Sequence, residues 1–438
     1  MRSSRTSSED DTDEKQEILQ KLDATLPANI GRRKFLLTTT AALVPGGLAG
    51  CSGNGNGNGN GNGNGSGNGN GNGSGNGNGN GSGNGNGNGS GNGDEDNLDQ
   101  EATWRQPWIA TMAWPTAHIA EQEGYFSDQG ITAPTVENGE GSPDTARRVG
   151  TGEADVGISE VGSVMSGMAE GSNATIVGMA RNRSLLSFTY RDDRMDSYED
   201  LEGSKVALGS PFAHTTWPVV PDILGLDPEE IETEPVDLGV AVGQISDGSA
   251  DAMYSGMIAQ VPLHQQAEEG ELDTDVTTVA LNKHADLVGF PFIAYDDWLA
   301  DSANHEYLIR VMEGYSQALK WALLNPEGVL DLMKNDINQE LQAQDDQELK
   351  NQYRVKMAIT VSSFIQDGGG LMDWNPDALQ ESFDVFGNAL FDDESAVPAL
   401  EEVVDRSFIE EADLATLSSD EWDQVYEWAQ PIITWFES

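Results

Sequence analysis

The stretch that decides the fold is residues 114–131, WPTAHIAEQEGYFSDQGI, followed after a short run by residues 141–162, GSPDTARRVGTGEADVGISEVG. In the first part, Gly124 can adopt the left-handed conformation that ends a helix. Tyr125 and Phe126 follow it directly, and apolar residues in that place fold back onto the helix that has just ended. The first part therefore predicts a helix with a sharp C-terminal stop.

The second part repeats this pattern. Ser142 and Pro143 are typical of an N-cap and a first helical position, and Gly152 is typical of a helix end. An apolar, β-prone run follows each predicted helix, at residues 131–136 and at residues 156–158. Helices that alternate with short strands predict the opening of an open α/β lobe.

The same region carries a family resemblance. The segments EGYFSDQGI (123–131), TGEADVGIS (151–159), DLEGSKVALGS (200–210) and ISDGSADAMY (245–254) resemble the NMT1/THI5-like group of periplasmic binding proteins. That group is related to nitrate, sulfonate, taurine and thiamine-pyrimidine importers. The resemblance covers roughly residues 104–411, and it implies a two-lobed solute-binding protein of an ABC importer.

The charge of the chain is strongly negative. Its 438 residues include 74 Asp and Glu against 23 Lys and Arg, which gives a formal net charge of −51. Nucleic-acid binding requires clustered cations, and docking on an anionic membrane requires a basic surface, so this charge argues against both. An acidic surface of this kind is typical of a halophilic protein, because concentrated salt screens its self-repulsion.

Residues 1–51 are interpreted as a leader. Arg32 and Arg33 precede an uncharged run at residues 38–50, which predicts twin-arginine export. The run ends at Cys51, the only cysteine of the chain, in a context that resembles a lipobox. We therefore expect lipidation at Cys51 and a protein anchored on the extracellular face of the cell membrane.

The rest of the chain divides into four segments. Residues 52–99 are mostly Gly, Asn and Ser and predict a flexible tether. Residues 100–188, with an opening strand at 108–113, are assigned to a first lobe and residues 189–284 to a second. Residues 285–438 return to the first lobe and add helices. Together with the resemblance, this predicts an α/β, two-lobed periplasmic-binding-protein type II fold with hinge crossovers and a helical C-terminal cap.

Candidate ligand-binding residues follow from a rule for open α/β sheets, in which ligands bind beyond the carboxyl ends of strands and often at helix N-termini. In the resembled family the same loops face the ligand. The residues selected in this way are Trp114, Asn138, Gly139, Ser142, Ser159, Glu160, Arg181, Ser210, His214, Thr215, Tyr254 and Ser255.

Two ligand classes remain open at this point. Trp114, Tyr254 and Glu160 favour a flat nitrogen heterocycle such as a thiamine-pyrimidine precursor. The helix start at residues 210–215, together with Arg181, favours nitrate, an alkyl sulfonate or another small anion. Each residue also has a structural interpretation: the aromatic rings as core, the glutamate as a partner of the helix dipole, and the arginine in a salt bridge.

The sequence offers little support for catalysis. The five histidines show no paired metal-ligand spacing, and no nucleophile elbow or phosphate-binding loop is present. The pyrimidine-synthase relatives of the resembled family carry a cysteine-rich motif that this chain lacks. We therefore expect a monomeric binding protein without cofactor or metal, which delivers a small molecule to an ABC permease and its ATPase. A pyrimidine-synthase-like enzyme and a sensory ectodomain are the alternatives.

Overall fold

The computed structural model of the chain describes residue 98 and residues 100–360, 369–391 and 396–433. The predicted export signal at Arg32 and Arg33, the predicted lipidation site at Cys51 and nearly all of the predicted tether lie outside the described residues. Within the described part, no helix combines the length and the apolar character needed to cross a membrane.

The first lobe is built on a five-stranded mixed sheet. Its strands in spatial order are β2 (Thr135–Glu137), β1 (Thr103–Arg105), β3 (Val156–Ile158), β10 (Phe290–Tyr295) and β4 (Ala174–Arg181). β1 runs parallel to β2 and β3, whereas the returning strand β10 is antiparallel to β3 and β4. The early helices of this lobe are α2 (Thr116–Gln122), α3 (Tyr125–Asp128), α4 (Ser142–Gly150) and α5 (Val161–Ala169).

The second lobe repeats this architecture. Its sheet has the order β7 (Glu232–Pro235), β6 (Lys205–Leu208), β8 (Ala252–Gly256), β5 (Leu186–Arg191) and β9 (Val276–Ala280). β6 is parallel to β7 and β8, and β5 is antiparallel to β8 and β9. Its helices are α6 (Pro211–Thr216), α7 (Val219–Leu224), α8 (Leu238–Asp247) and α9 (Val261–Glu269), with short 3-10 turns at η1 (Tyr198–Leu201), η2 (Pro228–Glu230), η3 (Met257–Gln260) and η4 (Leu281–Lys283).

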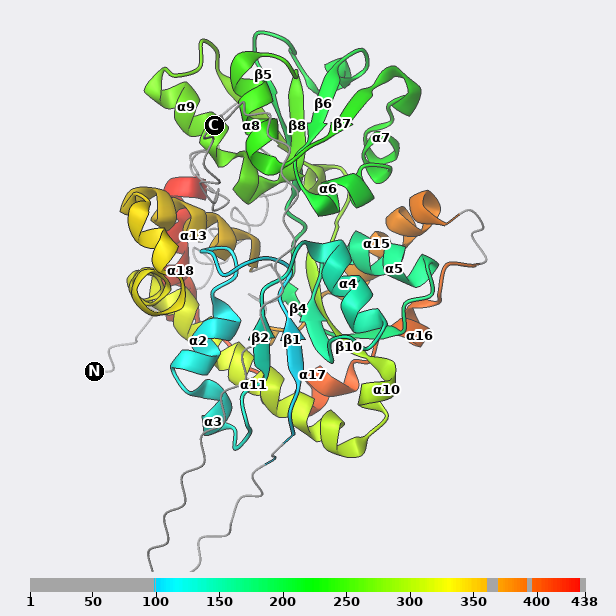
Figure 1. Cartoon of the computed structure of the whole chain (residues 1–438), viewed down its shortest axis with the longest axis vertical. Helices are drawn as coiled ribbons and strands as arrows, with labels where there is room; N and C mark the ends of the chain where they lie inside the picture. Colours follow the sequence, from blue (N-terminus) through cyan, green and yellow to red (C-terminus); the bar gives the residue numbers. More distant parts are fainter. Residues whose placement is uncertain (1–97, 99, 361–368, 392–395, 434–438) are drawn as a thin grey trace, which may run out of the picture. The chain divides into compact units, whose positions relative to one another are not determined.

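Helices make up the described chain after β10. They are α10 (Asp296–Leu299), α11 (Ser302–Leu324), α12 (Pro326–Leu332), η5 (Met333–Ile337), η6 (Gln339–Ala343), α13 (Asp346–Thr360), α15 (Pro376–Leu390), α16 (Leu400–Val403), α17 (Ser407–Glu411) and α18 (Ser419–Ile433). Helix α11 packs against α2 and α3 of the first lobe (Figure 1). The two sheets and the helical C-terminal region confirm the predicted fold class.

Two crossovers connect the sheets. The chain leaves β4 at Arg181, enters β5 at Leu186, and returns to β10 at Phe290. The crossovers touch each other, because the Gly289 amide donates to the Arg181 carbonyl oxygen at 3.2 Å. A Cβ atom at Gly289 would lie 2.2 Å from the Arg183 carbonyl oxygen. Only a residue without a side chain permits this approach.

Several predicted boundaries differ from those observed. The opening strand is β1 at residues 103–105 and not at 108–113, and Pro107 lacks the amide proton that would extend its ladder. Gly141 is the N-cap of α4, so Ser142 already lies inside the helix. Strand β5 begins at Leu186, which places residues 186–188 in the second sheet and not in the first lobe.

Candidate functional site

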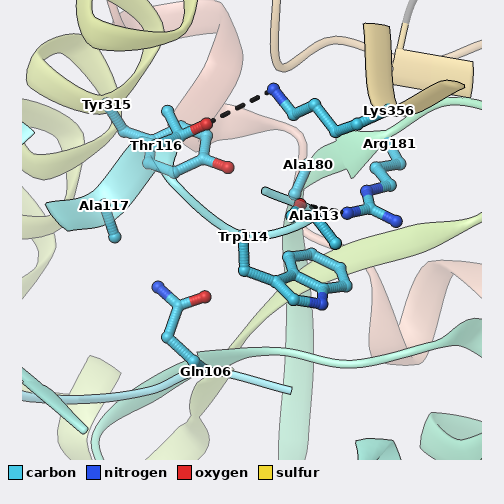
Figure 2. Close-up of a pocket in the computed structure, with 9 residues that line it drawn as sticks. All are labelled: Gln106, Ala113, Trp114, Thr116, Ala117, Ala180, Arg181, Tyr315 and Lys356. Atoms are coloured by element: carbon cyan, nitrogen blue, oxygen red, sulfur yellow. Dashed lines mark hydrogen bonds between the residues drawn. The ribbon is translucent and has the colours of Figure 1, made fainter. Parts of the chain in front are cut away.

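A small cavity lies beyond the carboxyl ends of strands β1 and β4. Its volume is about 10 Å³, which is about the space of one water molecule. Figure 2 shows the side chains around it. The cavity is lined by Gln106, Ala113, Trp114, Thr116, Ala117, Ala180, Arg181, Tyr315 and Lys356. All of these residues belong to the first lobe or to the helices that return to it.

Arg181 is the last residue of β4 and is held on three sides. Its guanidinium carbon lies 3.7 Å from the centre of the Trp114 ring and 5.1 Å from that of Phe290. Nη2 donates to the Ala113 carbonyl oxygen, whereas the buried Nη1 has no hydrogen-bond partner. The side chain is 2% exposed, and burial lowers the pKa of Arg181 to about 9. One donor of this guanidinium therefore remains available.

Lys356 on α13 is the second cation of the cavity. It is 3% exposed, and its Nζ lies 3.5 Å from Thr116 Oγ1 and 5.3 Å from the centre of the Tyr353 ring. Burial, and then the charge of Arg181, hold the pKa of Lys356 well below its usual range. The two positive charges are thus close enough to repel each other.

The polar groups of the cavity are mainly donors. Arg181 Nη1 and Gln106 Nε2 are buried without a partner, and Lys356 Nζ has only its long contact to Thr116. None of the nine lining residues is acidic. Buried cations with free N–H groups and no carboxylate nearby are suited to hold an anion, which would accept these hydrogen bonds and offset the charge.

Glu160 lies at a different place, where α5 of the first lobe meets α6 of the second. It is the N-cap of α5, and its Oε2 accepts from the Ser163 amide at 3.0 Å. Its Oε1 is buried without a partner, and burial raises the pKa of Glu160 to about 7. The charge of Glu160 also reaches Tyr254 of the second lobe, whose pKa is raised first by burial and then by this carboxylate. Tyr254 Oη shares a hydrogen bond of 2.9 Å with Thr216.

The other predicted residues of the second lobe satisfy their own loop. Ser210 Oγ accepts from the Ala213 amide at 3.3 Å and from Ser255 Oγ at 3.2 Å. A ring nitrogen of His214 lies 3.0 Å from the Leu208 carbonyl oxygen, and Thr215 Oγ1 donates to the Pro211 carbonyl oxygen at 3.4 Å. These side chains build the start of α6, and none of them lines the cavity.

The predicted loop residues of the first lobe are engaged in the same way. Asn138 Oδ1 accepts from the Ala110 amide at 3.2 Å, and Ser159 Oγ donates to the Ser142 carbonyl oxygen at 2.9 Å. A Cβ atom at Gly139 would come within 1.9 Å of the Gln106 carbonyl oxygen, so the chain there passes directly against the strand end. These residues shape the loops that surround the cavity.

The structure therefore brings together two of the predicted residues, Trp114 and Arg181. It adds four polar residues that the sequence interpretation missed, namely Gln106, Thr116, Tyr315 and Lys356. A signal for Lys356 was present, because it shares the helical spacing of buried residues such as Tyr353 and Thr360. A lysine on the apolar face of a helix is unusual enough to mark a functional position.

Known proteins were compared with this chain. The sequence matches the family model "NMT1/THI5 like" over residues 116–329. No curated protein sequence matches it. Among the described residues, no group of three or more His, Cys, Asp or Glu side chains is placed to hold a metal ion.

Solved structures share the fold at low sequence identity. The alkanesulfonate-binding protein SsuA from Xanthomonas axonopodis pv. citri, bound to MOPS, is 15% identical with a TM-score of 0.50, over 70% of this chain and 98% of that one. The aliphatic sulphonate-binding protein SsuA from Escherichia coli is 11% identical with a TM-score of 0.50, over 73% and 94%. A Candida albicans protein with the generic periplasmic binding protein fold is 12% identical with a TM-score of 0.51, over 73% and 99%. The chain therefore matches the NMT1/THI5-like family model over residues 116–329 and shares the periplasmic-binding-protein fold.

Proposed function

We propose that this protein is the extracytoplasmic solute-binding component of an ABC importer and that it captures a small anion at the cavity of Arg181 and Lys356. The observation that carries the proposal is this pair of buried cations, which no acidic residue of the cavity neutralises. The chain has a net charge of −51, yet this cavity has two cations and no carboxylate in its lining. That arrangement points to an anionic ligand.

The binding mechanism follows from the free donors. An anionic group at the cavity accepts hydrogen bonds from Arg181 Nη1, Lys356 Nζ and Gln106 Nε2, and it offsets the charge of two desolvated cations. Because Arg181 ends the strand from which the chain crosses to the second lobe, this contact acts next to the hinge. A ligand that contacts both lobes favours their closed arrangement by its differential affinity.

The same geometry favours an anion over a nitrogen heterocycle. A protonated ring nitrogen or an amine requires a carboxylate, and Glu160 is not among the residues of the cavity. The two SsuA proteins of the same fold are named for the sulfonates that they bind. A small sulfonate is therefore the first ligand to test, with nitrate and bicarbonate beside it.

The setting of this function follows the sequence interpretation. Export through the signal at Arg32 and Arg33 and a lipid at Cys51 would hold the protein on the outer face of the membrane. A permease and an ATPase would then receive the ligand. The protein acts in this scheme as a receptor and not as an enzyme, so incubation with the ligand leaves the ligand chemically unchanged.

A thermal-shift screen of the full-length chain tests the proposal. The panel contains methanesulfonate, taurine, nitrate, bicarbonate, thiamine and free pyrimidines. A ligand at a hundred times its Kd adds about 2.7 kcal/mol to the free energy of unfolding, which raises the Tm by several degrees. We expect this shift with an anion, and we expect Arg181→Met and Lys356→Met to abolish it.

The matched control is Lys350→Met. Lys350 lies on the same helix, and its Nζ pairs at 2.9 Å with Glu327 outside the cavity. This variant removes the same charge and keeps the response. A shift with thiamine or a pyrimidine alone would overturn the anion assignment, and no shift with any compound would overturn the proposed solute class.

A further inference from the structure

We propose that the cavity between Arg181 and Lys356 binds a monatomic anion, chloride in a salt-containing medium, and that the anionic group of the transported solute displaces it. This inference rests on the proposed function in one respect: the monatomic anion and the transported solute share one site. Its support is the charge, the hydrogen-bond donors and the size of the cavity.

The buried cations of the chain differ in whether an acidic side chain pairs with them. The buried guanidinium of Arg105 pairs with Asp144 at 2.8 Å, and that of Arg191 pairs with Asp273 at 2.7 Å. Arg181 and Lys356 are at least as buried, yet the charge that shifts the pKa of Lys356 is the like charge of Arg181. Two buried like charges require an anion between them or the loss of a proton.

The unpartnered N–H donors of the cavity favour an anion over a water molecule as its occupant. Arg181 Nη1 and Gln106 Nε2 are buried N–H donors without a partner, and Lys356 Nζ adds a third donor group. The nearby Ala113 carbonyl oxygen already accepts from Arg181 Nη2. A water molecule among these groups would need acceptors for its own hydrogens, which in this lining are the oxygens of Thr116, Tyr315 and Gln106, and it would leave the two positive charges unbalanced. A spherical anion accepts from every donor and has no hydrogen to place.

The size of the cavity favours a monatomic ion. The cavity holds about 10 Å³ as it stands, about the space of one water-sized body, so a monatomic ion needs less rearrangement than a carboxylate or a sulfonate. The Arg181 guanidinium is packed against two rings, because the ring centre of Trp114 lies 3.7 Å from it and that of Phe290 lies 5.1 Å from it. The anionic group of a sulfonate must therefore enlarge the cavity more than a halide does.

The test measures the Tm of the full-length chain while potassium chloride replaces potassium gluconate at constant ionic strength. Gluconate is too large for the cavity, so it serves as the silent anion. We expect the Tm of the wild type to rise by about 2 °C for each tenfold excess of chloride over its Kd. Lys350→Met should respond in the same way, and Lys356→Met should lose the response. Equal responses in all three proteins, or no response in the wild type, would overturn the proposal.

A second measurement covers a Lys356→Met variant that fails to fold. Crystals of the wild-type protein are soaked in potassium bromide, and anomalous scattering locates the bound ions. A bromide peak in contact with Arg181 and Lys356 supports the site, and its absence there overturns it. The two proposals fail separately: without a halide effect the solute screen can still succeed, and a failed solute screen leaves the chloride response intact.

Discussion

Two arginines that end consecutive strands of the chain, one in each sheet, differ sharply in their surroundings. Arg181 closes β4 of the first lobe and Arg191 closes β5 of the second, and both are almost completely buried. Arg191 pairs with Asp193 at 2.9 Å and Asp273 at 2.7 Å, and it donates to the Ile245 carbonyl oxygen at 3.0 Å. Arg181 meets two aromatic rings, one carbonyl oxygen and a second cation.

The pKa values of these arginines move in opposite directions. Hydrogen bonding to Asp193 raises the pKa of Arg191, whereas burial lowers the pKa of Arg181 to about 9. The folded protein therefore favours the charge at Arg191 and tolerates it at Arg181. The comparison teaches that burial of a cation alone does not indicate its role, because the partners decide between a structural and a binding arginine.

The largest effect is expected at Arg181. Replacement of Arg181 with methionine should weaken binding of methanesulfonate about 1000-fold, which is about 4 kcal/mol, because one partner of a buried charge contact is lost. The free energy of unfolding should stay unchanged or rise, because an uncompensated buried charge is removed. Calorimetric titration and urea denaturation measure the two quantities. Equal loss of both would place Arg181 with the structural arginines.

The next effect concerns Glu160, which is a buried acid without a cation. Its pKa is raised to about 7 in the folded protein, so between about pH 4.5 and 7 the folded state holds a proton that the unfolded state has released. Stability from this group is complete below pH 4.5 and is lost as the pH rises to 7.

The variant Glu160→Gln should therefore be more stable than the wild type at pH 8 by up to about 3 kcal/mol, with little difference at pH 4.5. Urea denaturation of both proteins across this range is the measurement. A difference that does not change with pH would show that Glu160 keeps its ordinary pKa in the fold.

A smaller and opposite effect is expected at Arg191. The variant Arg191→Met should lower the free energy of unfolding by about 2 kcal/mol, mainly through its lost hydrogen bond to the Ile245 carbonyl oxygen. The ion pair with the exposed Asp273 adds little, because solvent screens it. Binding of methanesulfonate should remain at the wild-type level. A loss of affinity at Arg191 would break the distinction between the two arginines.

The smallest effect is expected from the ring that holds Arg181. Replacement of Trp114 with leucine removes a cation–π contact of about 1 kcal/mol, so the Kd for methanesulfonate should rise about fivefold. Trp217→Leu is the matched control, because its ring packs on Tyr254 and not on the cavity. An equal rise of the Kd in both variants would indicate that loss of any large ring loosens the packing of the protein, and that the contact of Trp114 with Arg181 has no specific effect.

Much of the fold was predictable because its signals are local. Gly124 adopts a φ of 81° at the end of α2, as the sequence 114–131 predicted. The helical spacing after β10 likewise produced the long helix α11 with its buried Tyr307 and Tyr315. These features depend on residues a few positions apart in the sequence, so they can be predicted without knowledge of distant contacts.

The site was less predictable, because it depends on distant contacts. Thr116 and Lys356 lie 240 positions apart and meet only in the folded chain. The hydroxyl of Ser210 and the imidazole of His214 were assigned to a ligand, but both bond to their own loop. Short polar side chains at a helix start satisfy nearby backbone groups first, and a pattern of residue types cannot separate this use from ligand binding.

The hydrogen bond between the Gly289 amide and the Arg181 carbonyl oxygen joins the cavity of Arg181 and Lys356 to the crossovers, the axis on which the lobes would turn. A small shift near a hinge axis produces a large displacement at the far end of the lobe that moves. A displacement of a fraction of an ångström at Arg181 can therefore become a rotation of the whole second lobe. An alanine at position 289 would place its Cβ atom 2.2 Å from the Arg183 carbonyl oxygen and 3.0 Å from that of Arg181, so the backbone of this crossover would have to shift and the resting angle of the lobes would change.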